Sequence, residues 1–152
     1  MHQHKQMPCF RHKMVFVFLT MLGFMGCDSF HSKHMTIFPS SSEMPLTDLD
    51  IGQICAEVSS IAQRHGYMEN THAVSYFNSR YNEKKRLYSY SRATRRGGPL
   101  HIHVTFIPSN SVLQVGVVAE NNPLDEVTDV FHDIAEELSA KHPSLRIEQS
   151  FK

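Results

Sequence analysis

The sequence predicts an α+β fold, a two-layer sandwich in which a mainly antiparallel sheet of about five strands carries two helices on one face. Two segments repeat apolar residues at helical spacing, which predicts amphipathic helices. Other segments alternate apolar or aromatic residues with polar ones, which predicts half-buried strands. Because both helices need an apolar surface to cover, we expect them on one side of the sheet, in the chain order helix, two hairpins, helix, strand.

The first helix is predicted over residues 48–65. Its apolar residues recur mostly at steps of three and four, which places them on one helical face. They are Leu49, Ile54, Cys55, Val58, Ile61 and Ala62. Thr47 or Asp48 can cap the start of this helix, and Gly66 suits its end.

Two hairpins are predicted between the helices. Residues 71–80 and 86–94 are rich in β-branched and aromatic side chains, and a polar turn joins them. Residues 100–107 and 112–120 alternate strictly between apolar and polar positions, and the turn between them begins with Pro108.

The second helix begins after Asn122, a favoured capping residue, with Pro123 at its first position. Its apolar stripe comprises Leu124, Val127, Phe131, Ile134 and Leu138. Residues 144–152 predict a last strand. The crossover that leads to this strand allows it to pair in parallel with a neighbour.

The N-terminal segment has the layout of an export signal. Basic residues and no acid precede position 15, and Val15 to Met25 form an uncharged, mostly apolar run of 11 residues. This run is too short for a helix that crosses a bilayer, which needs about 20 residues. Gly26 and Cys27 then supply a small residue and a cysteine at the expected cleavage point.

In this arrangement the segment resembles the type II signal peptide of bacterial lipoproteins. The resemblance implies a diacylglyceryl group on the thiol of Cys27 and removal of residues 1–26. Asp28 resembles a signal that retains lipoproteins in the inner membrane, and the outer membrane stays open as the alternative. We therefore expect a protein that is lipid-anchored to the cell membrane on the periplasmic side. An ordinary cleaved signal and an unmodified apolar segment remain the other interpretations.

After the anchor we expect a flexible tether over residues 27–45, which are rich in serine and proline and lack periodicity, and a single domain over residues 46–152. Cys55 is then the only cysteine of that domain, so it has no internal disulfide partner. Since Cys55 lies on the apolar stripe of the first helix, we expect it to act as a small buried hydrophobe. The alternative is a reactive thiol.

The charge of the chain argues against general nucleic-acid binding. The sequence has 15 basic and 15 acidic residues, and removal of the signal peptide takes basic residues only, which leaves a net acidic domain. The chain also lacks a Gly-x-Ser-x-Gly elbow, a phosphate-binding glycine loop and a Cys-x-x-Cys pair. We therefore expect no enzymatic activity and no cofactor beyond the covalent lipid.

His101 and His103 are the candidate metal ligands. Alternate positions on a strand point to the same side, so both imidazoles project from one sheet face, where they could share zinc, copper or nickel. A convincing site needs a third ligand. The alternative is simple alternation, in which Leu100, Ile102 and Val104 take the core.

A second candidate surface comes from residues 86–94. If Leu87 and Ala93 face the helices, the binding residues on the opposite face beside the two histidines are Arg86, Tyr88, Tyr90 and Arg92. Tyrosine and arginine are favoured at the centres of protein interfaces, although an ordinary solvated sheet face has the same pattern.

The expected function is that of a non-catalytic lipoprotein that binds another cell-envelope protein or acts as an assembly accessory. Its partners would be the bilayer, through the acylated N-terminus, and that envelope protein. The alternative is a periplasmic metal- or small-ligand-binding module that uses the face carrying His101 and His103.

Overall fold

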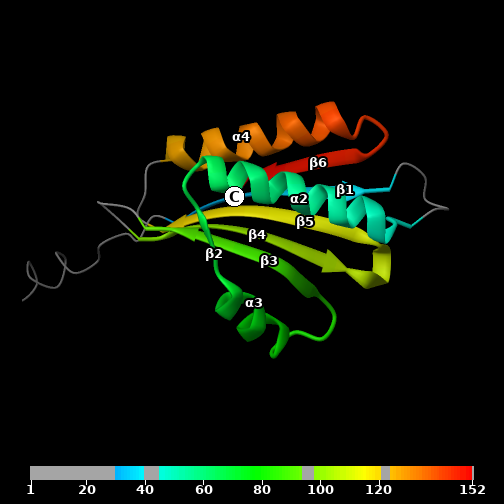
Figure 1. Ribbon diagram of the computed structural model, residues 1–152, viewed down its shortest axis with the longest axis horizontal. Helices are drawn as coiled ribbons and strands as arrows, with labels where there is room; N and C mark the ends of the chain where they lie inside the picture. The colour runs from blue at the N-terminus through cyan, green and yellow to red at the C-terminus, as the bar shows by residue number, and fades with distance from the viewer. Residues whose placement is uncertain (1–29, 40–44, 94–97, 121–123, 152) are drawn as a thin grey trace, which may run out of the picture.

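The computed structural model of the chain describes residues 30–39, 45–93, 98–120 and 124–151. They form a six-stranded antiparallel sheet in the order β2-β3-β4-β5-β1-β6. Helices α2 and α4 lie next to each other on one face of this sheet (Figure 1), so the predicted α+β fold with two helices on one face is confirmed. The elements in chain order are β1 (Phe30–Phe38), α2 (Asp48–Arg64), β2 (Met68–Glu69), α3 (Thr71–Asn78), β3 (Lys85–Arg92), β4 (Leu100–Ile107), the 3-10 helix η1 (Pro108–Asn110), β5 (Val112–Glu120), α4 (Leu124–Lys141) and β6 (Arg146–Phe151).

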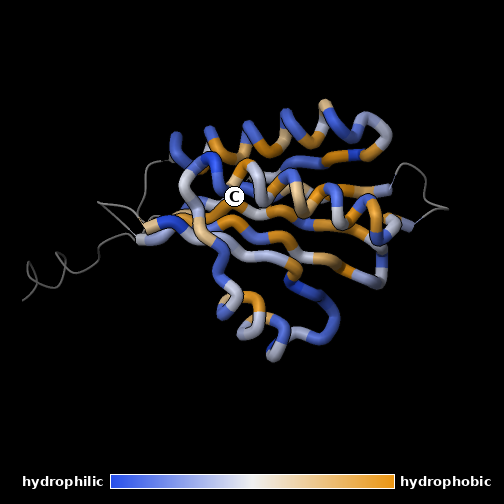
Figure 2. The backbone as a smooth tube through the Cα atoms, viewed as in Figure 1, coloured by the Kyte–Doolittle hydropathy of each residue, from blue (hydrophilic) through white to orange (hydrophobic). Residues whose placement is uncertain are grey.

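The hydrophobic core lies between the sheet and the pair α2 and α4. Figure 2 shows hydrophobic residues along the strands and hydrophilic residues on the outer side of α4. The side chains with no exposed surface include Ile54, Val58 and Ile61 of α2, Ile134 of α4, and Ile102, Val104, Val115 and Val117 of the sheet. Each such aliphatic side chain contributes about 1.5–3 kcal/mol through burial. The predicted stripes therefore face the core from Ile54 to Ala62 and from Val127 to Leu138. Leu49 is 69% exposed, and the side chain of Leu124 lies outside the described residues.

The start of α2 is fixed by its cap. The Thr47 side chain accepts a hydrogen bond from the backbone N–H of Asp50, and the Asp50 carboxylate accepts one from the backbone N–H of Thr47. The Thr47 hydroxyl also donates to the Asp50 carboxylate, and this bond, together with the one from the Thr47 N–H, lowers the pKa of the Asp50 carboxyl. This reciprocal pair is a capping box, which satisfies two of the N–H groups left unpaired at a helix start.

Strand β1 occupies a segment that the sequence analysis assigned to a flexible tether. β1 lies in the interior of the sheet, between β5 and β6, and its residues Met35 and Ile37 have no exposed surface. The predicted tether over residues 27–45, and the domain start at residue 46, are therefore wrong. The reason is that β1 supplies few apolar residues to the core and has Ser, His and Thr on its other face, so its alternation is weak in sequence.

Helix α3 replaces the strand predicted over residues 71–80. The Asn70 side chain accepts a hydrogen bond from the backbone N–H of Ala73 and caps the helix start. Val74 and Phe77 are half-buried and lie three residues apart, a spacing that suits one helical face. The β-branched and aromatic composition of this segment therefore did not predict its structure, because the packing of one helical side against β3 outweighs strand propensity.

The outer edge of β3 is shielded. Short strand β2 pairs with it at Ser91 and Tyr90, and the backbone N–H of Asn70 donates to the carbonyl of Ser89. Further along, the Asn78 side-chain amide donates to the carbonyl of Arg86 and accepts from its N–H, at 3.0 and 2.8 Å. Backbone groups that an edge strand would expose are thus paired.

Strand β6 runs antiparallel to β1, with Ile37 opposite Ile147 and Phe38 opposite Arg146. The parallel pairing considered for the last strand is therefore wrong. The reason is that the prediction did not include β1. Since β1 lies between β5 and β6, the last strand pairs with β1 and not with β5, and this pairing is antiparallel.

Candidate binding surfaces

The side of the sheet opposite α2 and α4 is called the open face here. On β4, Leu100, Ile102 and Val104 have no exposed surface and belong to the core. His101 and His103 therefore project from the open face, as the alternation of this strand predicted.

A row of paired residues crosses the open face. His34 of β1 lies opposite Gly116 of β5, which lies opposite His103 of β4, which lies opposite Ser89 of β3. Directly paired residues share a sheet face, so the two imidazoles lean toward each other across Gly116. Their ring centroids are 5.9 Å apart. His34 is therefore the histidine whose ring lies beside that of His103. His34 belongs to the segment that was predicted to be a tether.

The side chain of His103 is held in its neutral form. Burial, together with the smaller electrostatic effects of Arg86, His34 and His101, lowers its pKa from the ordinary value of 6.5 to about 3. A neutral imidazole retains a nitrogen lone pair at physiological pH, which is the form that binds metals.

This neutral histidine predicts a stability loss on acidification. Between pH 6.5 and about 3 the folded protein binds fewer protons at His103 than the unfolded chain does. The free energy of unfolding is therefore unaffected by this histidine above pH 6.5. It falls as the pH drops below 6.5, by at most about 1.4 kcal/mol per pH unit. Urea denaturation at pH 7, 6 and 5, with a chelator present, should show a shallower pH dependence for His103→Gln than for wild type. His132→Gln, at a side chain that is 74% exposed, should follow wild type. Equal slopes for all three proteins would contradict the assignment to His103.

Three of the four predicted arginine and tyrosine binding residues lie on the helix side of the sheet. Tyr90 is paired with Ile102 and is 2% exposed, and Tyr88 is paired with Val104. Arg92 donates to Glu126 of α4 at 2.7 Å and to the carbonyl of His65 at 2.9 Å.

The prediction that Tyr88, Tyr90 and Arg92 share the face of the two histidines is therefore wrong. A register shift between Arg86 and Tyr88 is the reason, because this bulge reverses the side to which the following residues point. It also explains why a strand with Ser89 and Ser91 on its other side still contributes Tyr90 to the core.

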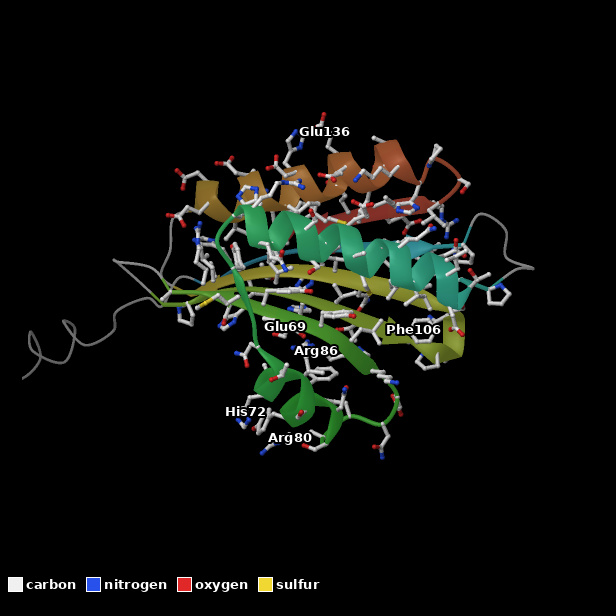
Figure 3. All side chains as sticks on the ribbon, in the orientation of Figure 1. Glu69, His72, Arg80, Arg86, Phe106 and Glu136 are labelled. Carbon is white, nitrogen blue, oxygen red and sulfur yellow. The ribbon has the colours of Figure 1, made fainter. Side chains whose placement is uncertain are left out.

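Arg86 comes before the bulge and lies opposite Thr105, on the open face. Its guanidinium stacks on Phe77 of α3, 4.0 Å from the ring centroid, and Figure 3 shows Arg86 where β3 meets α3. The Nε atom of Arg86 and the Oγ1 atom of Thr105 are both buried and have no hydrogen-bond partner among the described residues. Burial also lowers the pKa of Arg86. This half-buried arginine is thus partly desolvated at its Nε atom, and no carboxylate of the described residues pairs with it.

Aromatic and arginine side chains alternate around α3, and we call Tyr76, Phe77, Arg80, Tyr81 and Arg86 the α3 surface. Arg80 stacks on Tyr76 at 4.5 Å, and the rings of Phe77 and Tyr81 have centroids 4.5 Å apart. Tyr76 and Tyr81 are each 54% exposed, and Figure 3 shows Arg80 on the side of α3 away from the sheet.

A pocket of about 610 Å³ adjoins the α3 surface. It is lined by Phe77, Arg80, Tyr81, Asn82, Glu83 and Lys84. The sequence analysis missed this surface, although Tyr76 and Arg80, like Phe77 and Tyr81, are four residues apart. That spacing places each pair on one side of a helix.

The remaining predicted site residues are placed as follows. Cys55 is buried with a free thiol, and burial raises its pKa to about 11, as expected for a small buried hydrophobe. Cys27 and Asp28 lie outside the described residues.

Within the described part of the chain, no three or more His, Cys, Asp and Glu side chains are grouped so that they could hold a metal ion. None of the helices in that part is both long enough and apolar enough to span a bilayer.

The fold and these surfaces define an α+β domain with an antiparallel sheet that helices cover on one face. Comparison of the chain with protein-family models, with curated proteins and with solved structures found no match. The function is therefore argued from the surfaces themselves.

Proposed function

We propose that the chain is a non-catalytic lipoprotein, anchored through Cys27 and facing the periplasm, whose domain binds another cell-envelope protein through the α3 surface. The observation that carries this proposal is the exposed stack of aromatic and arginine side chains on α3. Tyrosine and arginine are enriched among the residues that supply most of the binding energy of protein interfaces.

The α3 surface is well prepared to bind a protein. Its arginines already rest on aromatic rings, so the loss of side-chain freedom on binding is small. Arg86 is partly desolvated without a carboxylate partner among the described residues, so a carboxylate from a partner would gain a strong, charge-assisted contact.

The charge near the α3 surface favours an acidic partner. Residues 80–86 contain Arg80, Lys84, Lys85 and Arg86 against one acid, Glu83. Opposite charge across an interface accelerates association and selects the correct partner. We therefore propose that the partner segment is acidic and inserts an apolar or aromatic side chain into the adjoining pocket.

The position of the anchor would leave the α3 surface accessible to a partner, on the side of the domain away from the bilayer. Cys27 precedes Phe30, the first residue of β1, by three residues, so the lipid lies at most about 10 Å of chain from the sheet. β1 starts at the sheet end where β3 finishes with Arg92, while β3 begins with Lys85 at the other end. Eight residues of strand span about 25 Å. The pocket beside Lys84 would therefore face away from the bilayer. Asp28 favours the inner membrane.

The proposal is tested by site-specific crosslinking in intact membranes. A photo-crosslinking amino acid placed at Asn82, an exposed residue of the pocket lining, should give one reproducible adduct with an envelope protein. Arg80→Glu should reduce the adduct yield by at least about tenfold, because it removes the stack with Tyr76 and repels an acidic partner.

Arg146→Glu is the matched control. Arg146 also stacks on an aromatic ring, that of Phe38 at 4.4 Å, but it lies on β6 at the far edge of the sheet. Its adduct yield should equal that of wild type. An adduct that persists in Arg80→Glu, or the lack of any adduct at Asn82, would contradict the α3 surface as the binding site.

A further inference from the structure

A second pocket lies on the helix side of the sheet, between α2 and α3 and against β3, and we call it the α2–α3 pocket. Among the residues that line it are Ile51, Gly52 and Cys55 of α2, Val74 of α3 and residues 85–88 of β3. Its volume is about 390 Å³, and pockets of roughly 300–1,000 Å³ are typical of small-ligand sites. Apart from Arg86, it shares no residue with the α3 surface or with the pocket that adjoins that surface.

We propose that the α2–α3 pocket binds a small carboxylate that carries an apolar or aromatic body. The ligand is a small molecule, so this site goes beyond the protein partner proposed for the α3 surface. Three features support it: apolar walls, two cations without a carboxylate partner among the described residues, and a helix glycine that leaves the space open.

The walls of the pocket are apolar. Ile51 and Cys55 are four residues apart and lie on one side of α2, while Val74 faces the pocket from α3. On β3, the bulge leaves Leu87 without an opposite residue on β4. Bulges are frequent beside functional sites, where they redirect a side chain. Because Ile51, Val74 and Leu87 are only half-buried, an apolar ligand that covers them would remove hydrophobic surface from water.

The charges at the pocket favour an anion. Lys85 and Arg86 line it against one acid, Asp48, in the first turn of α2. Neither cation forms an ion pair with a carboxylate of the described residues, and the Nε atom of Arg86 is buried without a hydrogen-bond partner there. A carboxylate in the pocket would therefore gain charge-assisted contacts that the described part of the chain does not supply.

Gly52 keeps one wall of the pocket open. It lies in the interior of α2, where glycine is less favourable than alanine. No atom lies within 4 Å of the place that its Cβ would take, and its φ is not positive. Neither packing nor backbone conformation therefore requires a glycine at this position, whereas a ligand in the pocket would need the space.

The proposal is tested by nuclear magnetic resonance of the isotope-labelled full chain, titrated with naphthalene-2-carboxylate and with octanoate. The amide signals of Val74 and Leu87 should shift along one saturable curve. Naphthalene-2-carboxamide has the same body without the charge and should bind at least about fivefold more weakly. All titrations use one nonionic detergent, so partition of the probe into micelles is common to them.

Two pairs of variants make the test specific. Gly52→Leu should weaken binding by at least about tenfold, because its side chain would fill the pocket, while its urea midpoint should equal or exceed that of wild type. Gln53→Leu is the matched control, since Gln53 is exposed and does not line the pocket, and its affinity should stay within about twofold of wild type. Lys85→Gln should weaken the carboxylate about threefold and leave the carboxamide unchanged. Lys84→Gln, at a residue of the other pocket, should change neither.

Three results would each overturn the proposal. They are the lack of saturable shifts in wild type with both carboxylates, an equal loss of affinity in Gly52→Leu and Gln53→Leu, and equal affinities for naphthalene-2-carboxylate and its carboxamide. Each is measured on the purified protein, so none of them bears on the crosslink at Asn82, and the two proposals fail or stand separately.

Discussion

Met35→Lys is expected to unfold the domain at room temperature. Met35 has no exposed surface and lies in the middle of β1, opposite Val115 on one side and Gln149 on the other. A lysine there would bury a charge, at an effective cost of several kcal/mol in addition to the lost packing. Domains of this size are stable by about 5–15 kcal/mol in total. Far-ultraviolet circular dichroism with urea denaturation measures the loss.

Thr36→Lys is the control for that experiment. Thr36 is the next residue on the same strand, but it points to the open face and lies opposite Glu148 of β6. A lysine there can reach solvent and an acid, so we expect a change within about 1 kcal/mol. If the two variants had the same stability, β1 would not be a core strand and residues 30–38 would again read as a tether.

Cys27→Ala is expected to abolish both lipid attachment and removal of the signal peptide. In the family that the N-terminus resembles, the cysteine thiol receives the lipid before cleavage. Intact mass of the wild-type protein from the membrane fraction should therefore match a chain that begins at Cys27 and carries a diacylglyceryl group. The Cys27→Ala protein should keep the mass of the uncleaved chain.

Two other masses would change the interpretation of the wild-type protein. A chain cleaved near residue 27 but without lipid would be a freely exported protein, and the orientation argument for the α3 surface would fail. An uncleaved chain without lipid would remove the assignment to the periplasm as well.

The elements that could be predicted from the sequence are those with strong, uninterrupted periodicity. Helices α2 and α4 have long apolar stripes, and β4 and β5 alternate over eight or nine residues around a turn with Pro108. Each of these patterns has one dominant physical explanation. The prediction was therefore correct for the hairpin of β4 and β5, for helices α2 and α4, and for the sheet face to which His101 and His103 point.

The elements that were missed take their structure from distant partners. β1 has a lysine at position 33 on its core side, where the ammonium lies 5.9 Å from the ring centroid of Phe131, and this polar residue breaks the apolar alternation. α3 is short and takes its structure from contacts with β3. The contact between His34 and His103 could not be found from sequence, because it depends on the pairing of β1 with β5 and of β5 with β4.

The pairing of β1 also governs the order in which the chain can fold. Both neighbours of β1, β5 and β6, come from the C-terminal part of the chain, whereas synthesis delivers β1 before either of them. Contacts between distant segments form slowly, because a long loop must close before they stabilise the fold. β1 therefore remains an unpaired strand until nearly the whole chain has emerged, and during that interval it is exposed to mispairing with other chains. If lipid is attached at Cys27, the unpaired β1 would be held at the membrane surface. This anchoring would reduce its encounters with other incompletely folded chains in solution.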